Sequence, residues 1–404
     1  MSKTVCLGFV ILALAGTIGS VGAETEVRTT MELAAAAYRG KDRTWYFTGG
    51  GRADVRLASV GNDAIKAEAA VEFYPLDITG AESSVEADTP AVDLKRLWLK
   101  ANFPSWRLTA GKTKLAWGNG FVFNSGDLLF GSLGPAVDFT QSTVRDDTAF
   151  LTAFNIPTGR FSYVEGVLLP PNLVWDGTAL EAQTIEKSSG GLRAFGRLGG
   201  WRLEGGYLYK GDAKTAYDLL GHRGYVSVHG HAGVDLYGAA SFAAGYDGSA
   251  GVTRDSWDEV KSTVNLSLGA FHQLAVGYDG TLSLRFEALV MPWQNWDPVP
   301  FDDLGTAGTG YYGLMLYPEV VWTIRSTWNI GLRALVSPID ASAQFTASAG
   351  WDVFRGFSLT GYLVMNAGRP DSLYAWDRSS AWPAAWTDSV PNGAALTLGG
   401  SYRY

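Results

Sequence analysis

The chain has 404 residues, of which 47% are hydrophobic and 13% aromatic, and its formal net charge at pH 7 is −8. A mean hydropathy of +0.02 is too low for a bundle of membrane helices. Glycine (50 residues) and aromatic residues are both frequent, a combination that favours β-structure over helix. The single cysteine, Cys6, excludes a disulfide framework and a cysteine-based metal site.

Residues 1–23 have the features of a secretory signal peptide. A lysine precedes an apolar run over residues 7–15, and small residues follow as far as Ala23. This order predicts cleavage after Ala23 and export of residues 24–404, which we treat as one domain. An uncleaved anchor helix is the alternative. After residue 24 the sequence has no apolar run of the roughly 18 residues that a membrane helix needs.

Apolar and polar residues alternate along most of the remaining chain. In residues 65–74 (IKAEAAVEFY) the apolar side chains fall on one face of an extended chain, and the lysine and glutamates fall on the other. Residues 44–58, 343–354 and 357–365 show the same period of two. Segments of about 9–15 residues with this pattern suit tilted strands that cross a bilayer.

The expected strands are joined by links that alternate between short and long. The strands lie near 25–38, 44–58, 65–75, 91–102, 107–124, 147–156, 161–170, 190–198, 201–210, 223–229, 234–245, 262–277, 281–293, 311–325, 329–336, 343–354, 357–368 and 393–404. The long links cover 76–90, 125–146, 171–189, 211–222, 246–261, 294–310 and 369–392, and all of them fall on one side of the sheet.

Short turns on one side and long loops on the other are typical of outer-membrane barrels. The sequence therefore predicts an all-β, transmembrane antiparallel β-barrel of about 18 strands, with short periplasmic turns and long extracellular loops. Sixteen strands would follow if the pair within 223–245 were misassigned. A soluble β-sandwich or propeller also alternates strands and turns, but neither predicts this asymmetry of loop length.

The last residues, ALTLGGSYRY, keep the alternation to the end of the chain, with Tyr402 and Tyr404 on the apolar parity. This segment resembles the C-terminal assembly signal of Gram-negative outer-membrane proteins. The resemblance implies that barrel assembly machinery recognises Tyr402 and Tyr404, although a terminal Phe is commoner in those proteins. Closure of a barrel also requires the last strand to pair with the first, because lipid cannot satisfy an open sheet edge.

Residues 111–127, GKTKLAWGNGFVFNSGD, are similar to a Gly-Arg-Gln…Trp-Gly…Phe-Asn-Pro-x-Asp pattern of porin-like barrels, including relatives of alginate-export channels. The matching residues are Gly111, Lys112, Trp117, Gly118, Gly120, Phe123, Asn124 and Asp127. Thr113 and Ser125 depart from the pattern, in place of its Gln and Pro. The resemblance implies a porin-like protein and does not identify a solute.

Charge is segregated between the loops and the strands. The seven long links, together with 39–43 and 337–342, hold 24 acidic and 10 basic residues, whereas the rest of the chain holds 16 acidic and 22 basic residues. Basic residues on the polar parity are expected to face the lumen, because a cation on the lipid face costs about 2–4 kcal/mol at the midplane. The expected pore-lining residues are Arg52, Arg56, Lys66, Arg96, Lys100, Lys112, Lys114, Arg193, Arg197, Arg285 and Arg333.

The link 125–146 is predicted to fold into the lumen as a constriction loop. Its five large apolar residues would be costly to leave in water, and Asp127, Asp138 and Arg145 are the charged residues expected at the constriction. The rival interpretation packs this loop over the barrel mouth. Lys112 and Lys114, just before it, share their parity with the apolar Leu108 and Ala110, so the parity supports their inward direction less strongly than that of the other basic residues.

A lumen of 18 strands is too wide for side chains alone to fill. The sequence therefore predicts a passive porin for small hydrophilic solutes, weakly selective for anions, in outer-membrane lipid. The alternative is a surface barrel with a plugged lumen, structural or adhesive, that makes contacts through 171–189 and through 369–392, where Trp376, Trp382 and Trp386 lie. A transporter of hydrophobic compounds would require an apolar lumen, which the charged parity does not provide.

No catalytic residue, metal, cofactor or nucleic-acid partner is expected. An outer-membrane hydrolase needs a base beside a nucleophile, and no such arrangement surrounds any of the four histidines. His229 and His231 are two residues apart and could share a strand face, but no third ligand is apparent. The sequence leaves the oligomeric state open.

Overall fold

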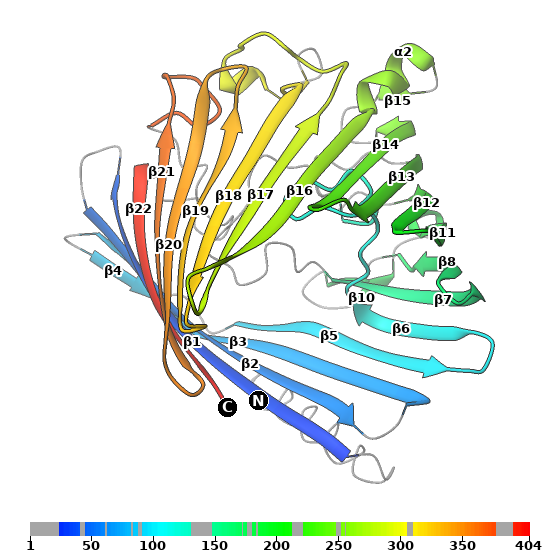
Figure 1. Cartoon of the computed structure of the whole chain (residues 1–404), viewed down its shortest axis with the longest axis horizontal. Coiled ribbons are helices and arrows are strands. Elements are labelled where there is room, and N and C mark those ends of the chain that lie inside the picture. Colours follow the sequence, from blue (N-terminus) through cyan, green and yellow to red (C-terminus); the bar gives the residue numbers. More distant parts are fainter. Residues whose placement is uncertain are drawn as a thin grey trace.

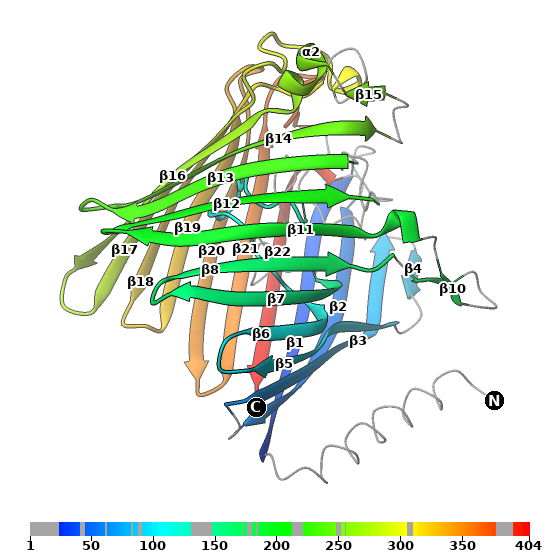
Figure 2. The ribbon, with the colours of Figure 1, turned by 90° about the vertical axis from the view of Figure 1, so that its right-hand side faces the viewer.

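The computed structural model describes residues 24–40, 45–60, 63–81, 84–87, 91–130, 148–171, 173–175, 180–182, 185–211, 221–247, 252–254, 256–304, 310–376 and 391–404. These residues form a closed antiparallel β-barrel of 18 strands (Figures 1 and 2). The predicted signal peptide lies outside the described residues.

The wall begins with β1 (Glu24–Gly40), β2 (Trp45–Val60), β3 (Ile65–Ala81), β5 (Ala91–Asn102), β6 (Arg107–Thr113), β7 (Ala149–Gly159), β8 (Ser162–Leu169), β11 (Ser189–Leu198) and β12 (Trp201–Lys210). It continues with β13 (Gly221–His231), β14 (Asp235–Asp247), β16 (Asn265–Val276), β17 (Gly280–Val290), β18 (Leu314–Ile324), β19 (Trp328–Ser337), β20 (Ser342–Phe354), β21 (Phe357–Ala367) and β22 (Pro391–Arg403). Short strands in the connections are β4 (Ser84–Ala87), β9 (Leu173–Trp175), β10 (Leu180–Ala182) and β15 (Val252–Arg254).

The described helices are single turns: η1 (Ile185–Lys187), α2 (Trp257–Val260), η2 (Lys261–Thr263) and η3 (Phe301–Asp303). Within the described ranges, none of them has the length and apolar character that a membrane-crossing helix requires.

The barrel closes where β22 pairs with β1. Tyr402 lies opposite Met31 in the register. The backbone of Tyr404 exchanges two hydrogen bonds with that of Thr29, at 3.1 and 2.9 Å. The prediction that the last strand closes the sheet is confirmed, and so is the strand number, because β13 and β14 both belong to the wall. The short turns gather at the end that holds the C-terminus (Figure 2).

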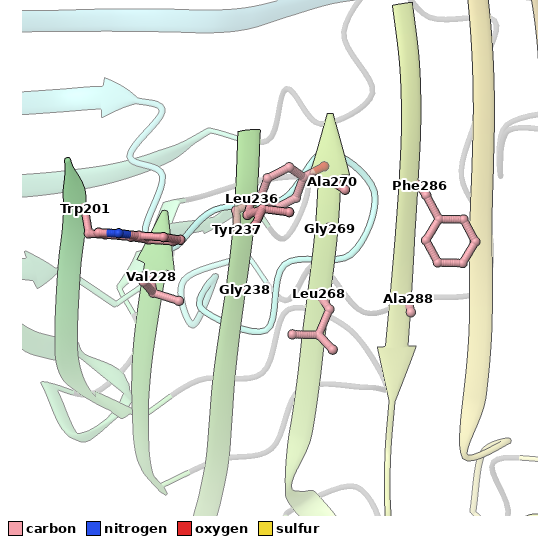
Figure 3. A pocket seen from close by; sticks show the side chains of 10 residues that line it. All are labelled: Trp201, Val228, Leu236, Tyr237, Gly238, Leu268, Gly269, Ala270, Phe286 and Ala288. Carbon is pink, nitrogen blue, oxygen red and sulfur yellow. The ribbon is translucent and has the colours of Figure 1, made fainter. Parts of the chain in front are cut away.

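Side chains alternate between the two faces of the wall, as a period of two requires. On β16 and β17, Leu268 and Phe286 are 58% and 48% exposed, whereas the preceding Ser267 and the following Glu287 are buried inside the barrel. An apolar groove crosses the outer face over β12–β17. Leu268 and Phe286 line it on β16 and β17, and Trp201 and Val228 line it on β12 and β13 (Figure 3). The outer face is therefore apolar over the height that would contact lipid.

Exposed tryptophans lie on the outer face of β12 and of β18–β20 near the short turns. Trp322, Trp328 and Trp351 are all about 40% exposed there, and the rings of Trp328 and Trp351 stack with centroids 4.9 Å apart. Trp201 lies flat against Gly230, where any side chain would meet its ring. Aromatic girdles of this kind mark the level of a membrane–water interface.

One expected strand is shorter than its sequence pattern suggests. The alternation predicts a strand over 107–124, but β6 ends at Thr113 and the chain then turns into the barrel. Glycines provide the turn: Gly111 and Gly118 have φ of +123° and +69°, values that L-residues with side chains rarely adopt. Residues 114–130, called the infolded loop below, are thus inside the lumen and not in its wall (Figure 1).

Candidate functional site

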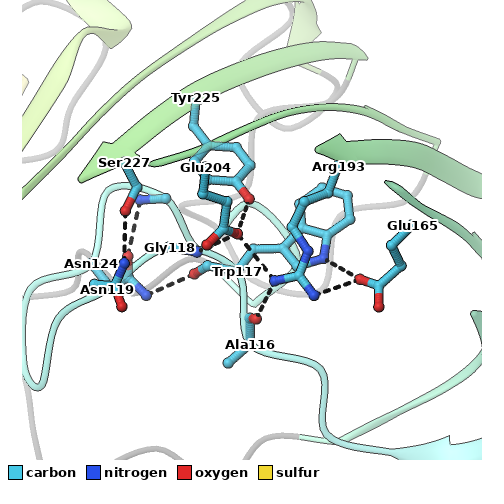
Figure 4. A network of polar contacts seen from close by, with 11 residues as sticks. Ala116, Trp117, Gly118, Asn119, Asn124, Glu165, Arg193, Glu204, Tyr225 and Ser227 are labelled. Carbon is cyan, nitrogen blue, oxygen red and sulfur yellow. Dashed lines mark hydrogen bonds and ion pairs between the residues drawn. The ribbon is translucent and has the colours of Figure 1, made fainter. Parts of the chain in front are cut away.

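The infolded loop lies against the inner face of β8, β11–β14, β16 and β17, and polar groups of that wall bind its backbone. Arg193 on β11 donates to the carbonyl of Ala116 at 2.9 Å and also pairs with Glu165 and Glu204, at 2.7 and 3.0 Å (Figure 4). Glu165 in turn accepts from the Trp117 indole at 3.2 Å. The root of the loop is therefore held by a compact acid–base cluster.

Glu204 extends this cluster along the loop. It accepts hydrogen bonds from the Gly118 amide at 3.1 Å and from the Tyr225 hydroxyl. Arg193 lies over the Trp117 ring, 5.7 Å from its centroid. The guanidinium, the two carboxylates and the indole pair with one another, as charges at a buried site require, although the buried Nε of Arg193 has no hydrogen-bond partner among the described residues.

Glu287 on β17 holds the middle of the loop. Its carboxylate accepts hydrogen bonds from three consecutive amides, those of Phe121, Val122 and Phe123, at 2.7, 2.7 and 2.9 Å. The Tyr237 hydroxyl on β14 also donates to it. The Glu287 side chain is completely buried. Hydrogen bonds to a charged acceptor are about twice as strong as neutral ones, so this carboxylate is the strongest single attachment of the loop.

Serines and basic residues complete the attachment. Ser227 accepts from the Asn119 side chain at 2.9 Å, and Ser267 accepts from the Ser125 amide at 3.0 Å. Farther along, Arg223 donates to the carbonyl of Leu128 at 3.4 Å. The wall thus presents acceptors to the N–H groups of the loop and a donor to a carbonyl, which fixes the path of a segment that has no regular secondary structure.

A second connection, 369–376, also enters the barrel. The Leu373 amide donates to Asp340 at 2.6 Å, and the Tyr374 amide donates to Ser342 at 3.2 Å. Both side chains join a buried apolar cluster that includes Val122 of the infolded loop. Burial raises the pKa of the Tyr374 phenol well above its ordinary value, so it stays neutral and packs as an apolar ring. Apolar side chains therefore fill the lumen beside β17–β21.

The opposite side of the lumen is lined by charge. We call the inner face of β1–β3, β5 and β6 the charged wall. Its ion pairs run from strand to strand: Arg52 contacts Glu32 at 2.6 Å and Glu72 at 3.5 Å, and Lys95 contacts Glu72 at 3.2 Å. Asp93 then lies 3.5 Å from both Lys95 and Lys112. Acidic and basic groups alternate across five neighbouring strands.

A second group of ion pairs lies beside this row. Glu68 on β3 contacts Arg56 at 2.8 Å and Arg96 at 3.4 Å. With Asp54, which shares the inward parity of β2, the ion-paired region of the charged wall holds five basic and five acidic side chains. They are Arg52, Arg56, Lys95, Arg96 and Lys112, and Glu32, Asp54, Glu68, Glu72 and Asp93.

Water reaches the two sides of the lumen to different degrees. The side chains of Arg52 and Arg56 are 30% and 39% exposed, whereas Arg193 behind the infolded loop is 8% exposed. Both faces lie inside the barrel, so among the described residues the charged wall is the side of the lumen that is more accessible to water. The candidate site is the charged wall, whose ion pairs are partly exposed inside the barrel.

The predicted pore-lining residues fall into three groups. The first group lies on the charged wall and consists of Arg52, Arg56, Arg96 and Lys112. Lys112 faces inward although the residues that share its parity earlier in β6 are apolar, because Gly111 breaks the alternation. The second group, Arg193, Arg285 and Arg333, lies on the side that the loop covers. The Arg285 guanidinium lies 3.7 Å from the centroid of the Phe121 ring, and Arg333 lies 3.7 Å from Glu319. Lys66, Lys100 and Arg197 lie toward the periplasmic end, and Lys114 is exposed just beyond β6.

The constriction loop enters the lumen earlier in the chain than predicted. Infolding begins at residue 114 and not at 125, so the Trp117–Phe123 segment belongs to it. Asp127 lies in the loop, where its carboxylate accepts from the Phe130 amide at 3.2 Å. Asp138 and Arg145, and also Trp382 and Trp386, lie outside the described residues.

Two features of the site escaped sequence reasoning. Lys95 was not expected inside, but a bulge opposite Ala70 and Val71 places both Lys95 and Arg96 on the inner face. The contacts of Glu165, Glu204 and Glu287 with the loop were also missed. Their alternation with arginines on the inward parity was a signal for an interior position, but not for the backbone groups that they bind.

The histidine pair of β13 does not form a metal site in the structure. His231 contacts Asp235 at 2.9 Å, and His229 lies edge-on to the Tyr237 ring. Among the described residues, no group of three His, Cys, Asp or Glu side chains is placed to hold a metal ion.

Comparisons with known proteins rest on structure, since neither protein-family models nor curated protein sequences match this chain. Pseudomonas aeruginosa OccK7 (OpdD) superposes with a TM-score of 0.52 at 10% identity, covering 95% of this chain and 99% of that one. Acinetobacter baumannii OccAB4 gives 0.52 at 10% identity, with coverage of 94% and 98%. The outer membrane protein opdK from P. aeruginosa gives 0.50 at 8% identity, with the same coverage. At these identities the likeness is one of fold, and by fold this chain is a porin-like β-barrel of the kind found in Gram-negative outer membranes.

Proposed function

We propose that this chain is an outer-membrane channel for the passive diffusion of small hydrophilic solutes. The observation that carries the proposal is that the ion-paired arginines of the charged wall are partly exposed to solvent inside the barrel. A closed sheet with an apolar exterior suits lipid, and a charged interior suits water and polar solutes. The loop narrows the lumen, so solute size should limit passage.

The export and assembly of the barrel are part of the same proposal. Residues 1–23 would direct secretion and be removed, leaving Glu24 at the start of β1. Barrel assembly machinery would then recognise the last strand. We assign no catalytic step to the protein.

The plugged surface barrel is the less favoured function. It would require filling on all sides of the lumen, as 369–376 and the infolded loop fill it beside β17–β21. The exposed guanidiniums of Arg52 and Arg56 instead favour an open, hydrated path.

Liposome swelling with neutral sugars tests the proposed function. Vesicles containing the folded protein should swell in isotonic arabinose and more slowly in disaccharides, because the passage excludes solutes by size. Vesicles with boiled protein are the control. If folded protein at the same density in the vesicles admits none of these sugars, the channel function is wrong.

Selectivity follows from the balance of charge along the passage. The ion-paired region of the charged wall is neutral, so the predicted anion preference rests on Lys66 and Lys100 of the same wall, toward the periplasmic end. Lys66 contacts Asp63 at 3.5 Å. We expect weak anion selectivity, stronger when salt screens the acidic external loops. The double change Arg96→Glu with Lys100→Glu should move the reversal potential toward cations without loss of assembly.

Measurement of the reversal potential under a salt gradient checks this prediction. A barrel that inserts normally and keeps its wild-type reversal potential after the double change would place Arg96 and Lys100 off the conduction path. Their charges would then have only a structural role in the wall.

A further inference from the structure

A cluster of cations lies at the periplasmic end of β8, β11 and β12, below the infolded loop. Arg197 on β11 is directly opposite Arg202 on β12, and Arg202 is directly opposite His229 on β13. Side chains directly opposite each other on neighbouring strands have Cβ atoms about 4.5–5.5 Å apart. Two arginines and a histidine therefore stand side by side across three strands.

A third arginine joins them through an aromatic ring. Arg160, in the turn between β7 and β8, lies 5.4 Å from the centroid of the Phe161 ring, and Arg197 lies 5.6 Å from the same centroid. We call Arg160, Arg197 and Arg202 the periplasmic arginine cluster. Two guanidiniums of the cluster therefore lie within 5.6 Å of the centroid of one aromatic ring.

The cluster lacks the compensation that other interior arginines have. Arg193, four residues before Arg197 on the same face, pairs with two glutamates. Within the described chain, the three side chains of the cluster form no ion pair or hydrogen bond, and all three are exposed. On the neighbouring strand, the buried Nδ1 of His229 has no hydrogen-bond partner.

Like charges directly opposite each other destabilise a sheet, so the fold gains nothing from this arrangement. Arg197 and Arg202 share the inward parity of Arg193 and Glu204, which places them at the exit of the lumen and not on the lipid face. Guanidinium groups bind oxyanions through paired, parallel hydrogen bonds. An anion with two or more charged oxygens would remove the repulsion and satisfy the free donors.

We propose that the periplasmic arginine cluster is a binding site for soluble oxyanions of charge −2 or more, of the phosphate or polycarboxylate class. It is separate from the charged wall, where basic groups are already paired with acids. Acidic loops at the outer mouth and this cluster at the inner mouth would give the barrel opposite charge at its two ends.

Calorimetric titration of the folded, detergent-solubilised barrel with inorganic pyrophosphate tests the site. Wild-type protein should bind, more weakly as salt rises. The double change Arg197→Gln with Arg202→Gln should weaken binding at least about tenfold, the loss expected when even one charged hydrogen bond of roughly 1.5 kcal/mol is removed. Arg160→Gln is a second variant of the cluster. Arg160 lies in an exposed turn and not in a strand, so this change should leave the sheet intact.

Arg355→Gln is the matched control, because Arg355 is an exposed arginine in another short turn, between β20 and β21. It should bind pyrophosphate as the wild type does. No binding by wild-type protein, or equal weakening by Arg355→Gln, would overturn the proposal. Since titration needs no conduction, failure of this site and failure of the proposed channel remain distinguishable.

Discussion

Replacing Glu287 by alanine is expected to release the infolded loop and increase the conductance of the channel. The change removes the acceptor of three loop amides and of the Tyr237 hydroxyl. Hydrogen bonds to a charged group contribute about 1.5–3 kcal/mol each. Loss of only two, about 3 kcal/mol, shifts the equilibrium between infolded and released loop by roughly a hundredfold.

Two variants control for this effect. Glu32 carries the same charge on the opposite side of the lumen, where its carboxylate contacts Arg52 and not the infolded loop. Glu32→Ala should therefore leave the channel diameter unchanged. Glu287→Gln retains one carbonyl acceptor and should give an intermediate conductance. Liposome swelling should show larger sugars passing through Glu287→Ala alone. If Glu287→Ala inserts and keeps the wild-type size limit, the carboxylate does not hold the constriction.

Removing Tyr402, Arg403 and Tyr404 is expected to abolish assembly. These residues pair with β1 on one side and β21 on the other, so their loss opens the seam that closes the barrel. The backbone groups of Thr29 and Met31 that face β22 would lose their partners, and each unsatisfied backbone group costs several kcal/mol where lipid surrounds it. The truncated chain should accumulate in the periplasm and migrate identically before and after boiling on a detergent gel.

Deletion of residues 380–386 is the matched control for the truncation. This segment lies in the β21–β22 connection, outside the described residues, and we expect its removal to leave insertion intact. Fractionation of cells into periplasm and outer membrane measures both variants. Normal insertion of the truncated chain would show that the terminal residues are not required for closure.

Much of the barrel could be predicted because strand geometry leaves a direct trace in sequence. A residue must face either lipid or lumen, so the period of two persists along each strand and stops at its turns. Loop lengths revealed which strand ends share a side. The β13–β14 pair was harder to assign, since Gly224, Gly230 and Gly238 weaken its alternation.

The candidate site was only partly predictable because it depends on backbone groups and irregular geometry. Residues 114–124 alternate like a strand, yet the glycines at 111 and 118 turn the chain inward. The bulge at Lys95 has no sequence signature of its own. Glu287 binds amides, which every residue except proline carries, so no particular residue type in the loop identifies its partner.

Single-channel recording of the purified, unboiled protein in a planar lipid bilayer tests the central claim most directly. An open passage along the charged wall predicts discrete conductance steps for the wild type, absent after boiling, and larger steps for Glu287→Ala. A barrel that inserts, resists detergent and yet gives no steps at any voltage would contradict the account, because its lumen would then be closed.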